Sequence, residues 1–296
     1  MTTPARRRWR WRRRWGARIL ALLVLVFVVK GCVIEPGSLV ERDYTLQLPN
    51  WSPRCDGLRV DVVSDLHIGS PRNGLDQLDR LVARLLASDA QAVLMAGDYV
   101  ILSVFLGTYV PADVVAHRLR PLTARKPVYA VLGNHDWWKD GPRVRASLEA
   151  AGVVVLEDQA HALELGRCSL WLVGVGDLWE APHDIGRAFS AVNDARPAIA
   201  ITHNPNLFPR MPARASLVVA GHTHGGQIAF PVVGAPGLWN QPDGRYPRGA
   251  FVEGGRHLFV TPGIGTSILP IRFGVPPEVS RLTLRGASPH GPASTR

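Results

Sequence analysis

Polar side chains of the kinds that hold divalent metals stand at five places where an apolar run of the sequence ends. They are Asp65 and His67, Asp98, Asn134 and His135, His203, and His222 and His224. Carboxylate oxygens and imidazole nitrogens suit Mn, Fe, Zn or Ni, whereas a closed structural zinc site would be expected to contain cysteine. The Asp-x-His and His-x-His spacings place both members of a pair on one side of an extended chain, so each pair could grip one ion.

Each of these residues has an ordinary structural explanation when it is considered alone. An isolated Asp or Asn at the end of a strand usually caps a turn or a helix. An isolated His is usually a hydrogen-bonded polar residue, and we interpret the other histidines in that way: His117, His161, His183, His257 and His290. Five such positions in one chain favour a metal site over five unrelated caps.

The apolar runs before these residues predict the strands that position them. Their ranges are 58–64, 92–95, 127–132, 198–202 and 217–220. Further strands are predicted over 44–48, 153–156, 170–175, 257–261 and 279–284, and helices over 75–88, 112–120, 143–151 and 184–194. Alternating strands and helices indicate stacked βαβ units with buried parallel strands. Because α/β folds place their chemistry at the carboxyl ends of such strands, the five sites should meet at one edge of the sheet.

The order of these motifs resembles that of the calcineurin-like metallophosphoesterases. The matching pieces are Asp65-x-His67, Gly97-Asp98, Gly133-Asn134-His135-Asp136, His203 and Gly221-His222-x-His224. The resemblance implies a four-layer α/β/β/α sandwich over 58–285, with two mixed sheets between helices. It also implies two divalent metal ions, Mn in the first place and Fe, Zn or Ni as alternatives. The first ion would bind Asp65, His67, Asp98 and His224, and the second would bind Asp98, Asn134, His203 and His222.

The same resemblance implies hydrolysis of a phosphodiester or a pyrophosphate. Two ions about 3.5–4 Å apart clamp the phosphoryl group and activate water for in-line attack. As the catalytic residue, His135 would stabilise the developing charge or protonate the leaving oxygen. Asp136, where the family often has Glu, would orient a neighbouring histidine. A catalytically inactive, membrane-anchored binding or scaffold protein on the same fold is the competing hypothesis.

The closing pieces of the sequence, Gly265-Thr266-Ser267 and Pro270-Ile271-Arg272, resemble the membrane-associated bacterial branch of this family. That branch includes phosphodiesterases and the enzyme that cleaves UDP-diacylglucosamine in lipid A synthesis. A lipid-linked phosphoester substrate is therefore one expectation. The run 100–110 is unusually apolar for a loop, and it could belong to the core or touch lipid. Trp137 and Trp138 could line the substrate site or pack in the core.

The net charge of +10 belongs almost entirely to the first 30 residues, which hold eight Arg, one Lys and no acid. The rest of the chain is nearly neutral, so we expect no nucleic-acid partner. The apolar run 16–34 is long enough for a single-pass membrane anchor. Its basic flank predicts a cytoplasmic head and an extracytoplasmic catalytic domain. The resemblance implies that the membrane is that of a bacterial cell. A cleaved signal peptide, or a lipoprotein signal ending at Gly31-Cys32, is the alternative.

These observations divide the chain into four parts. Residues 1–35 are the basic head and anchor, 36–57 a linker with one short strand, 58–285 the metallophosphoesterase domain and 286–296 a flexible tail. Cys55 and Cys168 could pair if the body lies in an oxidising compartment. The sequence offers no geometry for that pair, so we do not predict a disulfide.

Overall fold

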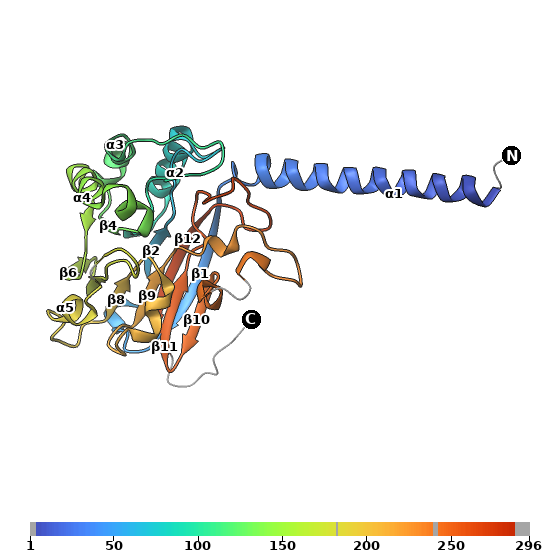
Figure 1. The fold of residues 1–296 in the computed structure, drawn as a ribbon. Coiled ribbons are helices and arrows are strands. Elements are labelled where there is room, and N and C mark those ends of the chain that lie inside the picture. Colours follow the sequence, from blue (N-terminus) through green and yellow to red (C-terminus); the bar gives the residue numbers. More distant parts are fainter. Residues whose placement is uncertain (1–3, 182, 239–241, 288–296) are drawn as a thin grey trace.

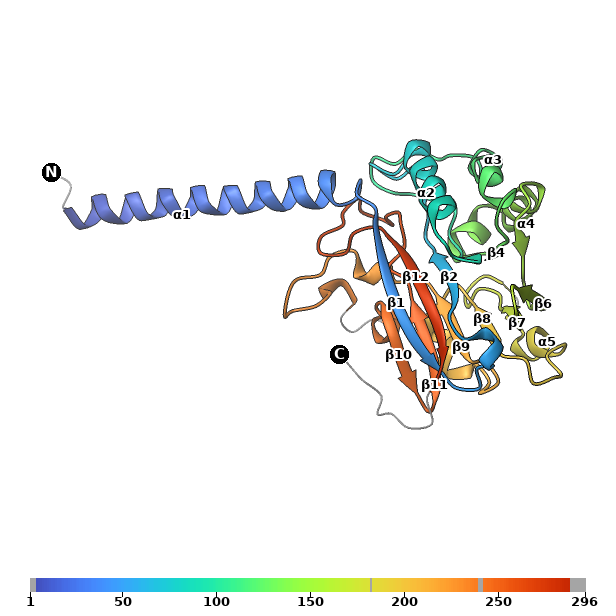
Figure 2. The same cartoon turned by 180° about the vertical axis from the view of Figure 1, so that it is seen from behind.

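The fold is built on two mixed six-stranded sheets (Figures 1 and 2). The computed structural model describes residues 4–181, 183–238 and 242–287. The first sheet has the order β1 (Val40–Leu48), β12 (Glu278–Gly286), β2 (Leu58–Val63), β3 (Ala92–Ala96), β4 (Val128–Val131) and β5 (Val154–Val155). The second has the order β10 (Gly249–Glu253), β11 (Arg256–Val260), β9 (Leu217–Ala220), β8 (Ala198–Ile201), β7 (Cys168–Gly174) and β6 (Gln159–Leu165).

Helices cover the outer faces of both sheets. On the first sheet they are α2 (Leu75–Ala87), α3 (Ala112–Thr123) and α4 (Asn134–Ala150), and on the second α5 (Ile185–Phe189) and the 3-10 helix η3 (Pro205–Arg210). Between the sheets lies a separate apolar layer that includes Val62, Leu94 and Ile201, all buried. The predicted four-layer α/β/β/α sandwich is therefore confirmed.

The strand directions bring the predicted site residues to one edge. Strands β2, β3, β4 and β5 are parallel to one another, as are β7, β8, β9 and β11. The carboxyl ends of β2, β3, β4, β8 and β9 each lead directly into one of the five predicted sites. These runs are almost wholly buried, as expected of parallel strands covered on both faces.

Helix α4 begins earlier than predicted. The expected helix over 143–151 starts at Asn134, so Asn134 and His135 lie in its first turn. Asp140 has non-helical dihedrals (φ 179°, ψ 80°) at a kink before Gly141-Pro142. The kink divides the element into a first helical turn that carries the site residues and a second part that corresponds to the predicted helix. Helix α5, in turn, is shorter than the predicted 184–194.

Two strands were missed, and β1 and β12 are longer than predicted. Strands β6 and β10 lie at opposite edges of the second sheet, and the sequence gave no clear apolar run for either. Strand β1 extends beyond the predicted 44–48 and pairs in parallel with β12 along its whole length. That part of the expected linker is thus an edge strand of the sheet. Of the expected tail, Gly286 ends β12, and 288–296 lie outside the described residues.

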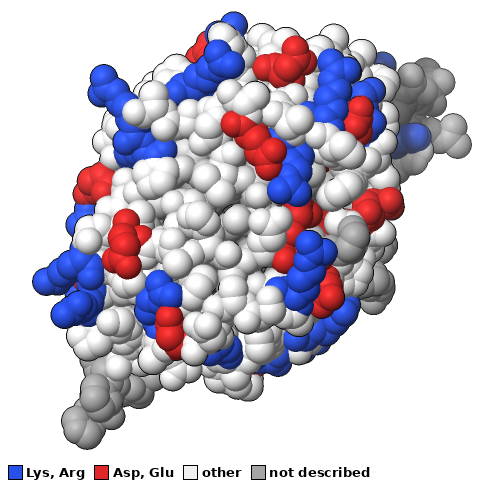
Figure 3. All heavy atoms as spheres, turned by 90° about the vertical axis from the view of Figure 1, so that its left-hand side faces the viewer, with Lys and Arg blue, Asp and Glu red and all other residues white. Residues whose placement is uncertain are grey.

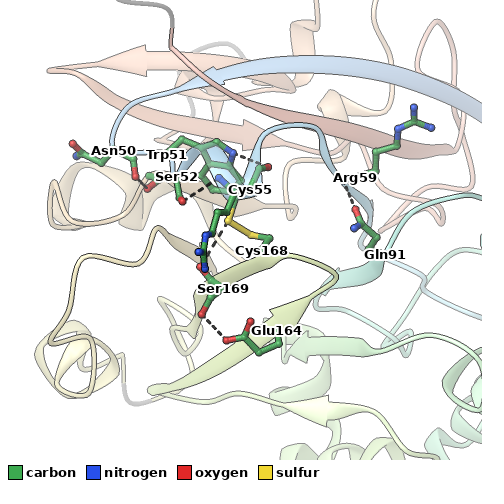
Figure 4. Close-up of a disulfide and its surroundings, with 11 residues drawn as sticks. Asn50, Trp51, Ser52, Cys55, Arg59, Gln91, Glu164, Cys168 and Ser169 are labelled. Atoms are coloured by element: carbon green, nitrogen blue, oxygen red, sulfur yellow. Dashed lines mark hydrogen bonds between the residues drawn. A yellow bond between two sulfur atoms is a disulfide. The ribbon is translucent and has the colours of Figure 1, made fainter.

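Cys55 and Cys168 form a disulfide, the pairing that the sequence had left open (Figure 4). Cys55 ends the 3-10 helix η2 (Pro53–Cys55) before β2, and Cys168 begins β7, so the bond joins the two sheets. The indole Nε1 of Trp51 donates a hydrogen bond to the Cys55 carbonyl over 3.0 Å beside it. The bond lies at the ends of β2 and β7 where these strands begin, away from the edge that gathers the predicted site.

Helix α1 (Pro4–Val28) continues into a π-helical segment, η1 (Val29–Ile34), and projects away from the body (Figures 1 and 2). Within the described residues there is one helix, Trp11–Ile34, that is long and apolar enough to cross a membrane. Its apolar side chains are exposed along most of its length, which suits a lipid environment. This helix could serve as the predicted anchor.

Candidate metal centre

The backbone turns sharply where the strands end. Five of the seven predicted metal ligands have positive φ angles: Asp65 (51°), His67 (39°), Asp98 (58°), His222 (71°) and His224 (52°). Such a conformation costs a non-glycine residue about 1–3 kcal/mol, and residues of this kind cluster at functional sites. Backbone hydrogen bonds hold the turns against this strain. The Asp65 amide donates to Gly97 O over 2.8 Å, and the His67 amide donates to Asp98 O over 3.1 Å.

Glycines allow these turns to approach one another closely. A Cβ on Gly133 would lie 2.2 Å from Asp98 Oδ1, and one on Gly221 would lie 2.6 Å from Asp65 Oδ2. Both distances are far shorter than a van der Waals contact, so any side chain at either position would displace a carboxylate of the site. The Gly-Asn and Gly-His pairs of the sequence motifs therefore have a steric explanation.

One group of buried side chains comes from two loops, with Asp65 and His67 after β2 and His224 after β9. Asp65 Oδ1 lies 3.3 Å from His224 Nε2 and 3.9 Å from His67 Nε2. The two imidazole nitrogens are themselves 3.2 Å apart. Asp65 Oδ1 is buried without a hydrogen-bond partner, an arrangement that costs free energy unless a cation compensates it. The donor set and the unpartnered oxygen fit a divalent metal.

A second group lies beside the first and shares Asp98 with it. His203 Nε2 lies 3.2 Å from Asp98 Oδ2, 3.1 Å from Asn134 Oδ1 and 3.2 Å from His222 Nδ1. Asp98 Oδ2 is also 3.5 Å from His67 Nε2, in the first group. The structure thus brings all seven predicted ligands into one cluster, with the Asp98 carboxylate between the two groups.

Burial and charge set the protonation of the imidazoles. Burial lowers the pKa of His67 to about 3, and burial together with the neighbouring His67 holds the pKa of His224 well below its usual value. Both rings are therefore neutral, as a metal requires. Burial would lower the pKa of His203 as well, but the Asp98 carboxylate raises it well above its usual value. Any bound cation would compete with that proton.

Hydrogen bonds from the far nitrogen orient two of these rings. His203 Nδ1 lies 2.7 Å from the Ala96 carbonyl, and His67 Nδ1 lies 3.2 Å from the Val100 carbonyl. A backbone carbonyl at Nδ1 makes that nitrogen the donor and leaves Nε2 as the electron-pair donor. In both residues Nε2 is the atom that faces the other site residues.

Asp136 does not orient a histidine, and that part of the prediction is wrong. Its carboxylate accepts hydrogen bonds from the backbone amides of Asp98 (2.8 Å), Tyr99 (2.9 Å), Gly133 (3.0 Å) and Val100 (3.3 Å). Burial raises its pKa to about 7. Asp136 therefore ties the loop after β3 to the first turn of α4, and it fixes Asp98 through the backbone.

Arg272 is a residue of the site that sequence reasoning did not place there. It is completely buried, and its Nη2 lies 3.5 Å from His224 Nδ1. Its guanidinium donates to the carbonyls of Gly265, Pro262 and Val275, and burial lowers its pKa to about 10. A charged residue is rarely buried, and the sequence signal for this one was only its place in the Pro270-Ile271-Arg272 piece.

His135 lies where the two groups open into a cleft of about 550 Å³. Its amide donates to Asp98 Oδ1 over 2.9 Å, its ring centroid lies 4.6 Å from that of His67, and its Nδ1 makes no hydrogen bond. Trp138 and Trp179 stack with centroids 6.2 Å apart and form one wall of the cleft. Trp137 packs instead against the core beneath the helices. Of the neighbouring pair Trp137 and Trp138, one therefore belongs to the core and the other lines the cleft.

A family model for the calcineurin-like phosphoesterases matches residues 58–226, more than half of the chain. The chain belongs to this family. It is thus a metal-dependent phosphoester hydrolase. Phosphodiesterase YaeI of Escherichia coli K12 is 34% identical to this phosphoesterase over 256 residues, which cover 84% of this chain and 90% of that protein.

Two further relatives are more distant. The metallophosphoesterase YkuE of Bacillus subtilis 168 is 27% identical, over 86% of this chain and 88% of that protein. A transmembrane protein with a metallophosphoesterase domain from Danio rerio is 28% identical, over 91% of this chain and 63% of that protein. A solved structure of a Haemophilus influenzae NAD nucleotidase is similar with a TM-score of 0.46 and 14% identity, over 70% of this chain and 45% of that chain.

Proposed function

We propose that this phosphoesterase hydrolyses a phosphodiester or a pyrophosphate with two divalent metal ions, Mn in the first place. The observation that carries the proposal is the position of the Asp98 carboxylate between two groups of donors. The first ion would bind Asp65, His67, Asp98 and His224, and the second Asp98, Asn134, His203 and His222. Two such ions, when bound, clamp the phosphoryl oxygens and lower the pKa of water.

The chain's own residues would supply the remaining chemistry. His135 lines the cleft from the first turn of α4, beside His67 and Asp98, so its imidazole can place a hydrogen bond on the leaving oxygen. Asp136 would keep Asp98 and Asn134 at a fixed separation through the amides that it binds. The tryptophan wall and the apolar side of the cleft would exclude water from the bound ester.

We propose further that the catalytic domain lies outside the cytoplasm of a bacterial cell, anchored by Trp11–Ile34. Two independent features support this orientation. The Arg-rich head before the helix favours the cytoplasmic side. The Cys55–Cys168 disulfide is of a kind that persists in oxidising compartments and is rare in the cytosol.

The test uses full-length protein in detergent, bis-p-nitrophenyl phosphate as substrate and a panel of Mn, Fe, Zn and Ni. We expect chelation to abolish turnover and the active metal to restore it. His135→Ala should lower kcat about 10²- to 10⁴-fold while metal content stays unchanged. Asp98→Ala should lose metal as well as activity, whereas the matched control His161→Ala, on exposed β6, should change neither.

The scaffold hypothesis makes the opposite prediction. An inactive binding protein would give no turnover with any of the four metals, although it could still bind them. Full activity in His135→Ala would also contradict the proposed role of that imidazole.

A further inference from the structure

Three loops around the mouth of the cleft contain no charged residue. They are 100–110, 226–238 and 266–271, and we call them the apolar rim. Together they hold 30 residues, among which six charges would be expected at the 20% average of the chain. By contrast, Lys and Arg lie among Asp and Glu on the face opposite α1 (Figure 3). The rim therefore departs from the composition of an ordinary water-facing surface.

The rim exposes large apolar side chains. Phe105 is 65% exposed, Leu106 76% and Ile268 75%, and Val232 is fully exposed. Val100, Ile101 and Val104 of the first loop are buried, so the loop has an anchored side and an exposed side. The run 100–110 thus lies partly in the core and partly on the surface. Contiguous exposed apolar surface of this kind marks a contact with a partner or a membrane.

Hydrogen bonds join the three loops into one surface. The Phe105 amide donates to Ile268 O over 3.0 Å, and the Ser267 amide donates to Gln227 Oε1 over 2.7 Å. The Ala229 amide donates to Phe273 O over 2.7 Å, just beyond the third loop. The exposed side chains are therefore held in place relative to one another and to the cleft.

The same surface is attached to the end of the membrane-spanning candidate helix. The Phe27 ring lies 5.0 Å from Phe273 and 6.5 Å from Phe230, and the Lys30 ammonium lies 4.6 Å from the Phe273 ring centroid. The Arg272 amide donates to Gly31 O over 2.9 Å. In Figures 1 and 2 the loops of the rim face the end of α1 that enters the body. If the helix spans the bilayer, Lys30 lies near the lipid head groups and the rim lies beside it.

The cleft opens within this rim. Leu102, Leu238 and Leu269 line it together with His135 and Asn134. At the outer side of the rim, the Lys139 ammonium lies 4.0 Å from the Tyr109 ring, an arrangement suited to the interface between lipid tails and phosphates. A substrate leaving the bilayer could thus reach the site with its apolar part still covered.

We propose that the apolar rim inserts into the bilayer surface beside the anchor and that the substrate is a phosphoester lipid. Its head group would enter the cleft, while its acyl chains stay in the bilayer or against the leucines of the rim. The evidence for the membrane contact is the apolar rim and the helix alone. The inferred substrate class also rests on the proposed phosphoesterase function.

The membrane contact can be tested without activity. A polarity-sensitive dye is attached at Leu106→Cys or Val232→Cys in a Cys32→Ala background, and the full chain is reconstituted in phosphatidylcholine vesicles. Val252→Cys is the matched control, because Val252 is 60% exposed on β10, which runs away from α1 (Figure 1). We expect blue-shifted emission and quenching by spin-labelled lipid at 106 and 232 only. Labels at these positions that are quenched no more than the label at 252 would overturn the proposal.

The substrate class needs a second measurement. The assay follows hydrolysis of bis-p-nitrophenyl phosphate by full-length protein in dodecyl maltoside micelles. The competitor is either phosphatidylglycerol or its deacylated counterpart, glycerophosphoglycerol. We expect the lipid to inhibit at least tenfold more strongly, and Leu106→Ser with Val232→Ser to remove that difference while turnover of the soluble ester is unchanged. Inhibition by the lipid that is no stronger than by the deacylated compound would overturn the inferred substrate class. If the unsubstituted protein does not hydrolyse bis-p-nitrophenyl phosphate at all, that result would instead contradict the phosphoesterase function.

Discussion

The disulfide between the sheets allows the stability of the body to be predicted quantitatively. Cys55 and Cys168 are 113 positions apart, so the bond closes a loop that contains β2 to β6 and helices α2 to α4. Replacing both with serine frees this loop in the unfolded chain. The chain-entropy relation gives a loss of about 5 kcal/mol for a loop of that length. At about 2–4 °C per kcal/mol for a body of this size, the unfolding midpoint should fall by about 10–20 °C.

The assay is thermal unfolding of full-length protein in detergent, followed by near-ultraviolet circular dichroism at fixed metal concentration. Cys32→Ser is the matched control and should leave the midpoint unchanged, because Cys32 is the one free cysteine. Activity at 25 °C should survive the double substitution, since the bond joins strand ends away from the metal edge. A midpoint that moves by less than about 3 °C would refute the loop-entropy reasoning. Three reactive thiols in the unfolded, unreduced wild type would refute the bond itself.

Two further changes test the surroundings of the site. Asp136→Asn replaces one accepting oxygen with an NH2 group that cannot accept, so at least two of the four buried amides lose their partner. We expect the unfolding free energy to fall by about 2–6 kcal/mol, measured by denaturation. We expect the metal affinity to fall about 10- to 100-fold, measured by metal titration. Glu157→Gln tests a buried carboxyl whose pKa burial raises from 4.5 to about 8. The stability that Glu157 contributes is fully present below pH 4.5 and is lost as the pH rises towards 8, by up to about 5 kcal/mol. Gln keeps the acceptor for the Leu132 amide, so the variant should gain stability relative to wild type between pH 5 and 9, measured by unfolding midpoints.

Each result has a clear contrary. Asp136→Asn with unchanged metal affinity would mean that the amide network does not position Asp98. Parallel pH profiles for Glu157→Gln and wild type would mean that the Glu157 carboxyl is ionised in the folded protein without cost.

The sequence predicted the features that depend on burial and on local spacing. Strands buried on both faces are near-continuous apolar runs, so β3, β8 and β9 could be located within a residue or two. The side chains that follow them could be assigned to one edge because parallel strands end together. The seven predicted metal residues lie close together for that reason.

The features that the sequence did not predict depend on partners far along the chain. Edge strand β6 has an alternating, mostly polar pattern, and it becomes a strand only through its pairing with β7. The Cys55–Cys168 pair and the contact between Arg272 and His224 are likewise set by tertiary approach. Asp136 was assigned the wrong partners because its hydrogen-bond donors are backbone amides, which leave no trace in residue type.

The position of β12 has a consequence for biogenesis. The last strand of the chain lies between β1 and β2, paired in parallel with one and antiparallel with the other. Strand β1 follows the candidate anchor helix almost at once, so the ribosome delivers the two neighbours of β12 long before β12 itself. If the body is translocated, β1 and β2 lack their shared partner strand until residue 286 has crossed the membrane. If α1 is inserted in the membrane, the unpaired edges of β1 and β2 would lie near the bilayer until β12 pairs with them.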